Sequence, residues 1–165
     1  MKTVLICGII IIIISIFSCN HSTNNEQLLQ KRVDSLENQI AGSYKPGFGE
    51  FMSGIQAHHA KLWYAGKNEN WRLADFEVHE IMELIQDIKT YETGRKESKE
   101  IDMIDPVLDS VNNAIEHKNP IEFRKSFILL TNTCNDCHKA VKFDFNVVKI
   151  PDFQQFSNQD FKLEK

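Results

Sequence analysis

Two cysteines and a histidine stand close together late in the chain, in the order Cys134-Asn135-Asp136-Cys137-His138. Two thiols at this spacing can add across the two vinyl groups on one edge of a haem, and the imidazole that follows can reach the iron. On a helix, positions i, i+3 and i+4 share a face, so all three side chains can point toward one ring. The pattern predicts one covalently bound haem c, with His138 as the proximal iron ligand.

Three other functions of a Cys-x-x-Cys pair fit this sequence less well. A thiol redox pair belongs near a strand-helix unit, and no strand pattern precedes Cys134. A structural zinc site needs four ligands, usually with a second cysteine pair, which this chain lacks. A disulfide between Cys134 and Cys137 would join two thiols of one helix and constrain little. These alternatives stay open, but haem attachment is favoured.

The start of the chain predicts export. A basic start is followed by an apolar run over positions 4–17, which is too short for a membrane span of about 20 residues. We therefore read residues 1–18 as a signal peptide. The run ends Ile16-Phe17-Ser18-Cys19, which resembles the bacterial lipobox, so Cys19 is the predicted lipidation site. The alternative is an uncleaved N-terminal anchor. We therefore expect a lipoprotein that is anchored in a membrane and faces the periplasm.

The four cysteines agree with this interpretation. Cys7 leaves with the signal peptide, Cys19 takes the lipid, and the remaining two take the haem. Covalent haem attachment takes place outside the bacterial cytoplasmic membrane, so export and the haem motif are consistent. The formal net charge of -4 at pH 7 argues against a nucleic-acid partner. The expected partners are the lipid membrane and a redox protein.

The segment 19–47 is predicted to be a lipid tether followed by a short amphipathic helix. Positions 20–27 are polar, and then Leu29, Val33, Leu36 and Ile40 repeat at helical spacing. Two heptads are too few for a stable isolated coiled coil. Packing on the main domain is one alternative, and weak self-association into a homodimer is the other.

Four further helices are predicted over residues 48–142: about 48–64, 71–91, from about 102, and from Asn119-Pro120 onward. The break after the first is expected at Gly66-Lys67-Asn68. Short turns between four helices favour an all-α, antiparallel up-down-up-down bundle. In the last helix, Cys134 and Cys137 continue the stripe begun by Phe123, Phe127 and Leu130, so the haem edge is expected to face the bundle interior.

This pattern resembles the cytochrome c prime family, in which four antiparallel helices carry a haem on the last helix. A basic residue commonly follows the haem histidine by four positions there, and the resemblance implies a haem-edge contact for Lys142. Two strings, His59-Ala60-Lys61-Leu62-Trp63 and Phe156-Ser157-Asn158-Gln159-Asp160-Phe161, also resemble a group of uncharacterised exported cytochrome-like proteins. That group has no established activity.

The sequence offers three alternatives for the sixth position of the haem iron. His59 is an attractive distal ligand by its position on the first bundle helix. Met52 shares its face, and some relatives of the cytochrome c prime family present a methionine from that helix. An open or apolar distal site is the third alternative. It would suit a haem protein that binds nitric oxide or carbon monoxide.

The segment 143–165 contains five phenylalanines, which argues for an extension packed on the bundle. We expect it to cover the bundle or to shield the proximal face of the haem. The sequence therefore predicts a membrane-anchored monohaem c-type cytochrome that transfers single electrons and is not an enzyme. A gas-binding haem protein and a structural lipoprotein without haem are the alternatives.

Overall fold

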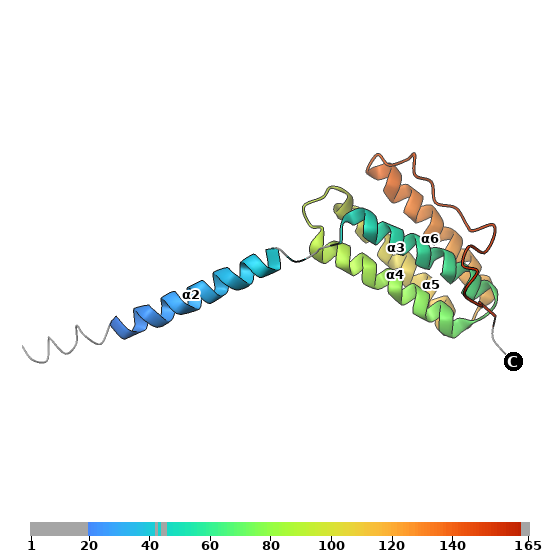
Figure 1. Cartoon of the computed structure of the whole chain (residues 1–165). Helices are drawn as coiled ribbons and strands as arrows, with labels where there is room; N and C mark the ends of the chain where they lie inside the picture. The colour runs from blue at the N-terminus through green and yellow to red at the C-terminus, as the bar shows by residue number, and fades with distance from the viewer. Residues whose placement is uncertain (1–19, 42, 44–45, 163–165) are drawn as a thin grey trace, which may run out of the picture. The chain divides into compact units, whose positions relative to one another are not determined.

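The computed structural model describes residues 20–41, 43 and 46–162 (Figure 1). It divides at residue 45 into two units, which are described separately. Every regular element in these described ranges is helical, which confirms the predicted all-α class. The signal peptide expected at 1–18 and the lipidation site expected at Cys19 lie outside the described residues.

In the described part of the first unit, the chain forms helix α2, from Asn20 to Ala41. The polar positions 20–27 are helical, so α2 begins before the predicted apolar stripe. Extending an existing helix costs far less than starting one, and polar residues can therefore continue a helix that the apolar stripe stabilises. Gln30 and Asp34, four residues apart, add a side-chain hydrogen bond of 2.8 Å.

The second unit contains four α-helices and two short 3-10 helices. The α-helices are α3 (Phe48–Lys67), α4 (Trp71–Tyr91), α5 (Asp105–Glu116) and α6 (Pro120–Ala140). The 3-10 helices, Glu97–Lys99 and Ile101–Ile104, occupy the connection from α4 to α5. The predicted positions of α4 and α6 are confirmed. The third α-helix begins at Asp105 because the 3-10 turns take up the positions before it.

Local side-chain chemistry explains where two of these helices begin. Asn70 precedes α4, and its side chain accepts a hydrogen bond from the backbone N–H of Leu73 at 3.3 Å. Asn119 precedes α6 and accepts from two backbone N–H groups of the first turn. Pro120 follows at the position where a missing N–H costs nothing. Both helices therefore begin at an asparagine N-cap, a residue type that is favoured at this position.

The predicted break at Gly66-Lys67-Asn68 is confirmed, because α3 ends at Lys67 and Asn68 is its C-cap, although Gly66 itself is still helical. A Cβ atom at Gly66 would lie 2.1 Å from Cζ of Phe123. The glycine is therefore a place where the Phe123 ring of α6 approaches the backbone of α3. The chain turns just afterwards, where Glu69 has a φ of 57°.

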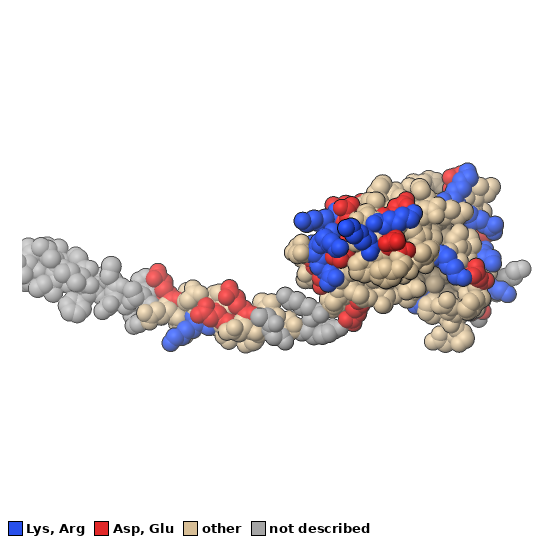
Figure 2. All heavy atoms as spheres, turned by 90° about the horizontal axis from the view of Figure 1, so that it is seen from above, with Lys and Arg blue, Asp and Glu red and all other residues tan. Residues whose placement is uncertain are grey.

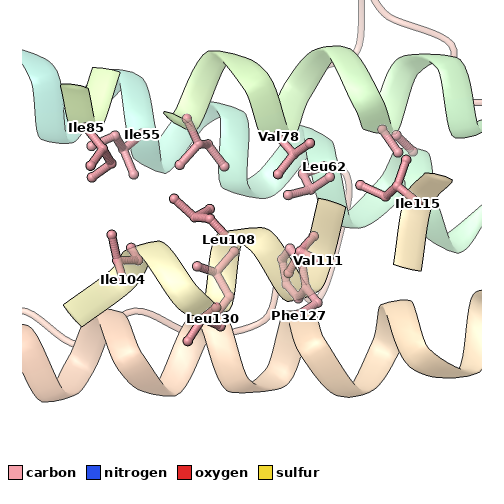
Figure 3. Packing of buried hydrophobic residues seen from close by; sticks show 14 of the residues in the cluster. Ile55, Leu62, Val78, Ile85, Ile104, Leu108, Val111, Ile115, Phe127 and Leu130 are labelled. Carbon is pink, nitrogen blue, oxygen red and sulfur yellow. The ribbon is translucent and has the colours of Figure 1, made fainter. Parts of the chain in front are cut away.

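The four α-helices of this unit enclose one apolar core. α3 packs against α4 and α6, and α5 packs against the same two helices. Figure 3 shows side chains from all four pointing toward a common interior. The fully buried members include Leu62, Val78, Leu108, Val111, Phe123, Phe127 and Leu130. Their helical spacing in the sequence explains why each helix turns one face inward.

The surface of the second unit is mixed in charge. On the face seen in Figure 2, lysines and arginines lie among aspartates and glutamates. No helix in the described ranges is long and apolar enough to cross a membrane.

Candidate haem-attachment site

A cavity of about 290 Å³ brings together the residues of the Cys-x-x-Cys-His motif. Cys134, Cys137 and His138 line it from the last turns of α6. Met52 and His59 line it from α3. The five residues predicted to surround the haem iron and its thioether edge therefore share one cavity.

Both cysteines are half-buried free thiols on the cavity side of α6. Cys134 also packs against the apolar core. Burial raises the pKa of Cys134 to about 12, and burial likewise raises the pKa of Cys137. Both groups are therefore protonated thiols at neutral pH.

His138 is held by the segment that follows α6. Its Nδ1 lies 2.5 Å from the backbone carbonyl oxygen of Asn146, so Nδ1–H is the donor. This hydrogen bond selects one neutral tautomer and leaves the lone pair on Nε2 for a ligand. A histidine that binds a metal through one nitrogen commonly donates from the other in this way.

Asn135, inside the motif, fastens the same segment to α6. Its side-chain amide donates to the carbonyl of Val148 at 2.8 Å and accepts from the N–H of Val148 at 2.8 Å. The amide also donates to the carbonyl of Thr131 at 3.1 Å. Asn135 and His138 therefore hold Val148 and Asn146, two residues apart, against the last turns of α6.

The rest of the C-terminal segment continues along the helical unit. The hydroxyl of Tyr64 donates to the carbonyl of Pro151 at 3.4 Å, and the buried ring of Phe161 lies 5.7 Å from the Tyr64 ring. Lys61 places its ammonium 5.2 Å from the centre of the Phe156 ring. Phe145, in contrast, is 79% exposed. Aromatic residues of this segment such as Phe161 therefore pack against the helical unit, whereas Phe145 is exposed to solvent.

His59 lines the cavity and is buried. Its ring packs on Phe127 with centroids 4.5 Å apart, and its Nε2 lies 3.0 Å from the hydroxyl oxygen of Thr131. Because the Thr131 hydroxyl donates to the carbonyl of Phe127, Nε2–H of His59 must be the donor to Thr131. Burial lowers the pKa of His59 to about 4, so the ring is neutral at pH 7.

Met52 lies at the level of His138. Contacts between α3 and α6 run in opposite directions along the chain: His59 meets Thr131, and Trp63 meets Phe127. Met52 is seven residues before His59, and His138 is seven residues after Thr131. At 1.5 Å per residue, both lie about 10 Å along their helices from the His59–Thr131 contact. Met52 and His138 therefore approach the cavity from opposite helices.

The cavity walls combine apolar and polar groups. Seven aliphatic side chains line it: Ile55, Ile85, Ile101, Ile104, Val141, Val147 and Val148. Gln56 and Arg95 also line it. The Arg95 guanidinium lies 5.0 Å from the Phe48 ring centre and 3.5 Å from the Glu97 carboxylate.

These residues fit a covalently held haem. The aliphatic walls match an apolar macrocycle, Arg95 can pair with an anionic propionate, and the motif supplies two thiols and an oriented imidazole. In the part of the chain that the structure describes, no three His, Cys, Asp or Glu residues are placed to hold a bare metal ion.

Lys142 lies just beyond the cavity. It is exposed, follows the cavity residue Val141, and has a φ of 66° at the end of α6. It is not among the cavity residues, so its haem-edge contact stays a prediction.

Sequence reasoning did not identify Asn135, Asn146 or Arg95 as members of the site. Asn135 occupies a variable position of the motif, and only its contact with Val148 reveals its role. Asn146 contributes a backbone carbonyl, which carries no residue-type signal. Arg95 comes from the connection between α4 and α5, far away in sequence.

Comparisons of this chain with protein-family models, curated protein sequences and solved structures find no match. The resemblance to the cytochrome c prime family therefore stays a prediction.

Proposed function

We propose that this protein is a membrane-anchored, monohaem c-type cytochrome that transfers single electrons outside the cytoplasmic membrane. The observation that carries the proposal is the shared cavity of Cys134, Cys137 and His138, with Nδ1 of His138 bonded to the carbonyl of Asn146. The thiols would hold the haem through thioether bonds, and Nε2 of His138 would be the proximal ligand. The bound haem supplies the one-electron chemistry.

For the sixth ligand we favour Met52 over His59. Met52 lines the cavity at the level of His138, whereas His59 lies about 10 Å further along α3 and its Nε2 is engaged by Thr131. A thioether ligand raises the reduction potential compared with a second imidazole. This assignment therefore predicts a higher potential than the alternative with two histidines.

An electron carrier needs access between its cofactor and a partner protein. Phe143 and Val147 line the cavity and are exposed, and Phe145 between them is more exposed still. An apolar edge of this kind suits a small, transient contact with a redox partner. It supports electron exchange rather than a reaction on a small substrate, and we propose no enzymatic activity.

We also propose that residues 48–142 form an antiparallel, up-down-up-down four-helix bundle, as in the cytochrome c prime family. The opposite direction of contacts between α3 and α6 supports it. The further proposal is a lipid on Cys19 that anchors the chain on the periplasmic side of a membrane. That part rests on the sequence alone.

The proposal is tested by expressing the full chain with the haem-attachment machinery. Haem that stays with the polypeptide on a denaturing gel, and is lost in the Cys134→Ser, Cys137→Ser double variant, would support the attachment site. Without haem in the unaltered chain, the structural lipoprotein becomes the better reading. The visible spectrum is then recorded with and without carbon monoxide.

The sixth ligand is tested with Met52→Ala and His59→Ala, compared in that holoprotein. We expect the unaltered protein to be low-spin and insensitive to carbon monoxide. Met52→Ala should become high-spin and carbon monoxide-sensitive, while His59→Ala stays low-spin. The reverse result would assign His59 as ligand. A high-spin spectrum in the unaltered protein would move the gas-binding function to first place.

A further inference from the structure

Helix α2 carries an apolar stripe whose side chains are exposed. Leu29, Val33, Leu36 and Ile40 repeat at intervals of four, three and four residues. Together with the neighbouring Leu28, these side chains are between 45% and 61% exposed. Exposing so many large apolar side chains on one helix is unfavourable, and such a face commonly marks a binding surface.

We propose that α2 pairs with α2 of a second copy of this chain, as a parallel two-stranded coiled coil. In heptad notation the two leucines of the stripe, Leu29 and Leu36, occupy d positions. The two β-branched residues, Val33 and Ile40, occupy a positions. Leucine at d with β-branched residues at a favours parallel dimers over larger assemblies. The residue types in the stripe therefore favour a pair of helices over a larger assembly.

The charges beside the stripe support the same arrangement. Arg32 falls at a g position and Glu37 at the e position five residues later; Figure 2 shows charged side chains of both signs on α2. In a parallel, in-register dimer, Arg32 of each chain faces Glu37 of the other copy, which gives two ion pairs by symmetry. An antiparallel pairing of the same stripe would place Arg32 opposite Gln39 and would form neither pair.

The length of α2 makes this pairing dependent on concentration. The helix has 22 residues, but its apolar stripe covers only about two heptads, which is marginal for a coiled coil in water. This step rests on the proposed lipid at Cys19. An anchor immediately before α2 would hold both copies in the same direction at one membrane surface. It would also raise their effective concentration, which strengthens a weak contact.

The first test compares two identical substitutions at adjacent residues. The full-length lipidated holoprotein is studied by sedimentation equilibrium in density-matched detergent micelles. We expect a dimer for the unaltered chain and for Leu28→Lys, because Leu28 is at a c position outside the seam. Leu29→Lys should weaken association at least tenfold. Monomers of the unaltered chain at every protein density would overturn the proposal, as would equal effects of the two substitutions.

The second test addresses orientation. Arg32→Glu alone and Glu37→Arg alone each place like charges across a parallel dimer, so each should weaken self-association several-fold. Mixed together, the two variants should form a heterodimer as tight as the original, detected by co-purification with a tag on one of them. No effect of either single variant would overturn the parallel arrangement.

The two proposals fail in distinguishable ways. The haem spectrum and the lipidated mass are measured on each sample. Loss of haem or lipid with pairing retained at high protein concentration would overturn the proposed function and leave the dimer standing. A normal spectrum and lipid without any pairing would overturn the dimer alone.

Discussion

Helices α2 and α6 carry apolar stripes of the same spacing, yet the two stripes have opposite fates. In α6, Phe123, Phe127 and Leu130 are fully buried, whereas the stripe of α2 is exposed. Periodicity in a sequence therefore establishes that a helix has an apolar face. It does not establish which surface covers that face, because the partner is set by elements elsewhere in the chain or on another molecule.

The contrast between the buried and the exposed stripe can be tested by truncating one apolar side chain in each. Phe127→Ala removes a fully buried ring that contacts His59 and Trp63, and should lower the free energy of unfolding of the helical unit by about 3–5 kcal/mol. Leu36→Ala in α2 should leave that unfolding transition unchanged within about 0.5 kcal/mol. Guanidinium denaturation followed by tryptophan fluorescence measures both. Similar losses for the two variants would contradict the contrast.

The buried imidazole of His59 should make the free energy of unfolding depend on pH in the acidic range. The pKa of His59 is lowered to about 4 in the folded protein, against about 6.5 when unfolded. The unfolded state therefore binds the extra proton first, and stability falls as pH drops from about 6.5 toward 4. The full effect is about 3 kcal/mol. Urea denaturation of the holoprotein at pH 7 and pH 4.5 should show a smaller pH-dependent loss in His59→Gln. An unchanged loss in that variant would show that other groups cause it.

A glycine pair within α3 separates close packing from helix propensity. Gly66→Ala places a methyl group against the Phe123 ring and should destabilise the protein by about 1–3 kcal/mol. Gly49→Ala, in the same helix with no atom within 4 Å of the new Cβ, should be neutral or stabilising by about 0.5–1 kcal/mol. Thermal unfolding measures both. A neutral Gly66→Ala would mean that α3 and α6 can separate at this point without cost.

The smallest expected effect concerns the hold of α6 on the C-terminal segment. Asn135→Ala removes both hydrogen bonds to Val148 and should cost about 1–2 kcal/mol. It should also speed hydrogen exchange of the Val148 amide and shift the haem spectrum through His138. Asp136→Ala, its exposed neighbour in the motif, loses only a surface ion pair with Lys139 and serves as the control. Equal exchange rates in the two variants would rule out a special role for Asn135.

Much of the fold could be read from local patterns. The Asn119-Pro120 start of α6 is an N-cap followed by proline, a signal contained in neighbouring residues, and the structure places the helix start there. The start of α4 at Trp71 follows in the same way from Asn70. The end of α3 within Gly66-Lys67-Asn68 was also predicted from local residues. The close approach of the Phe123 ring to Gly66 was not, because Phe123 lies 57 positions later in the chain.

The sequence by itself determined the all-α class and the inward face of each helix that packs in the core. It also predicts haem attachment at the Cys-x-x-Cys-His motif. All three follow from residues within a few positions of one another, where helix geometry alone sets the side-chain directions. The tertiary structure alone decided that Met52 and His138 line one cavity, that Thr131 engages His59, and that the carbonyl of Asn146 orients His138. Those contacts depend on how packed helices slide and how the chain returns over them, and no local pattern encodes that.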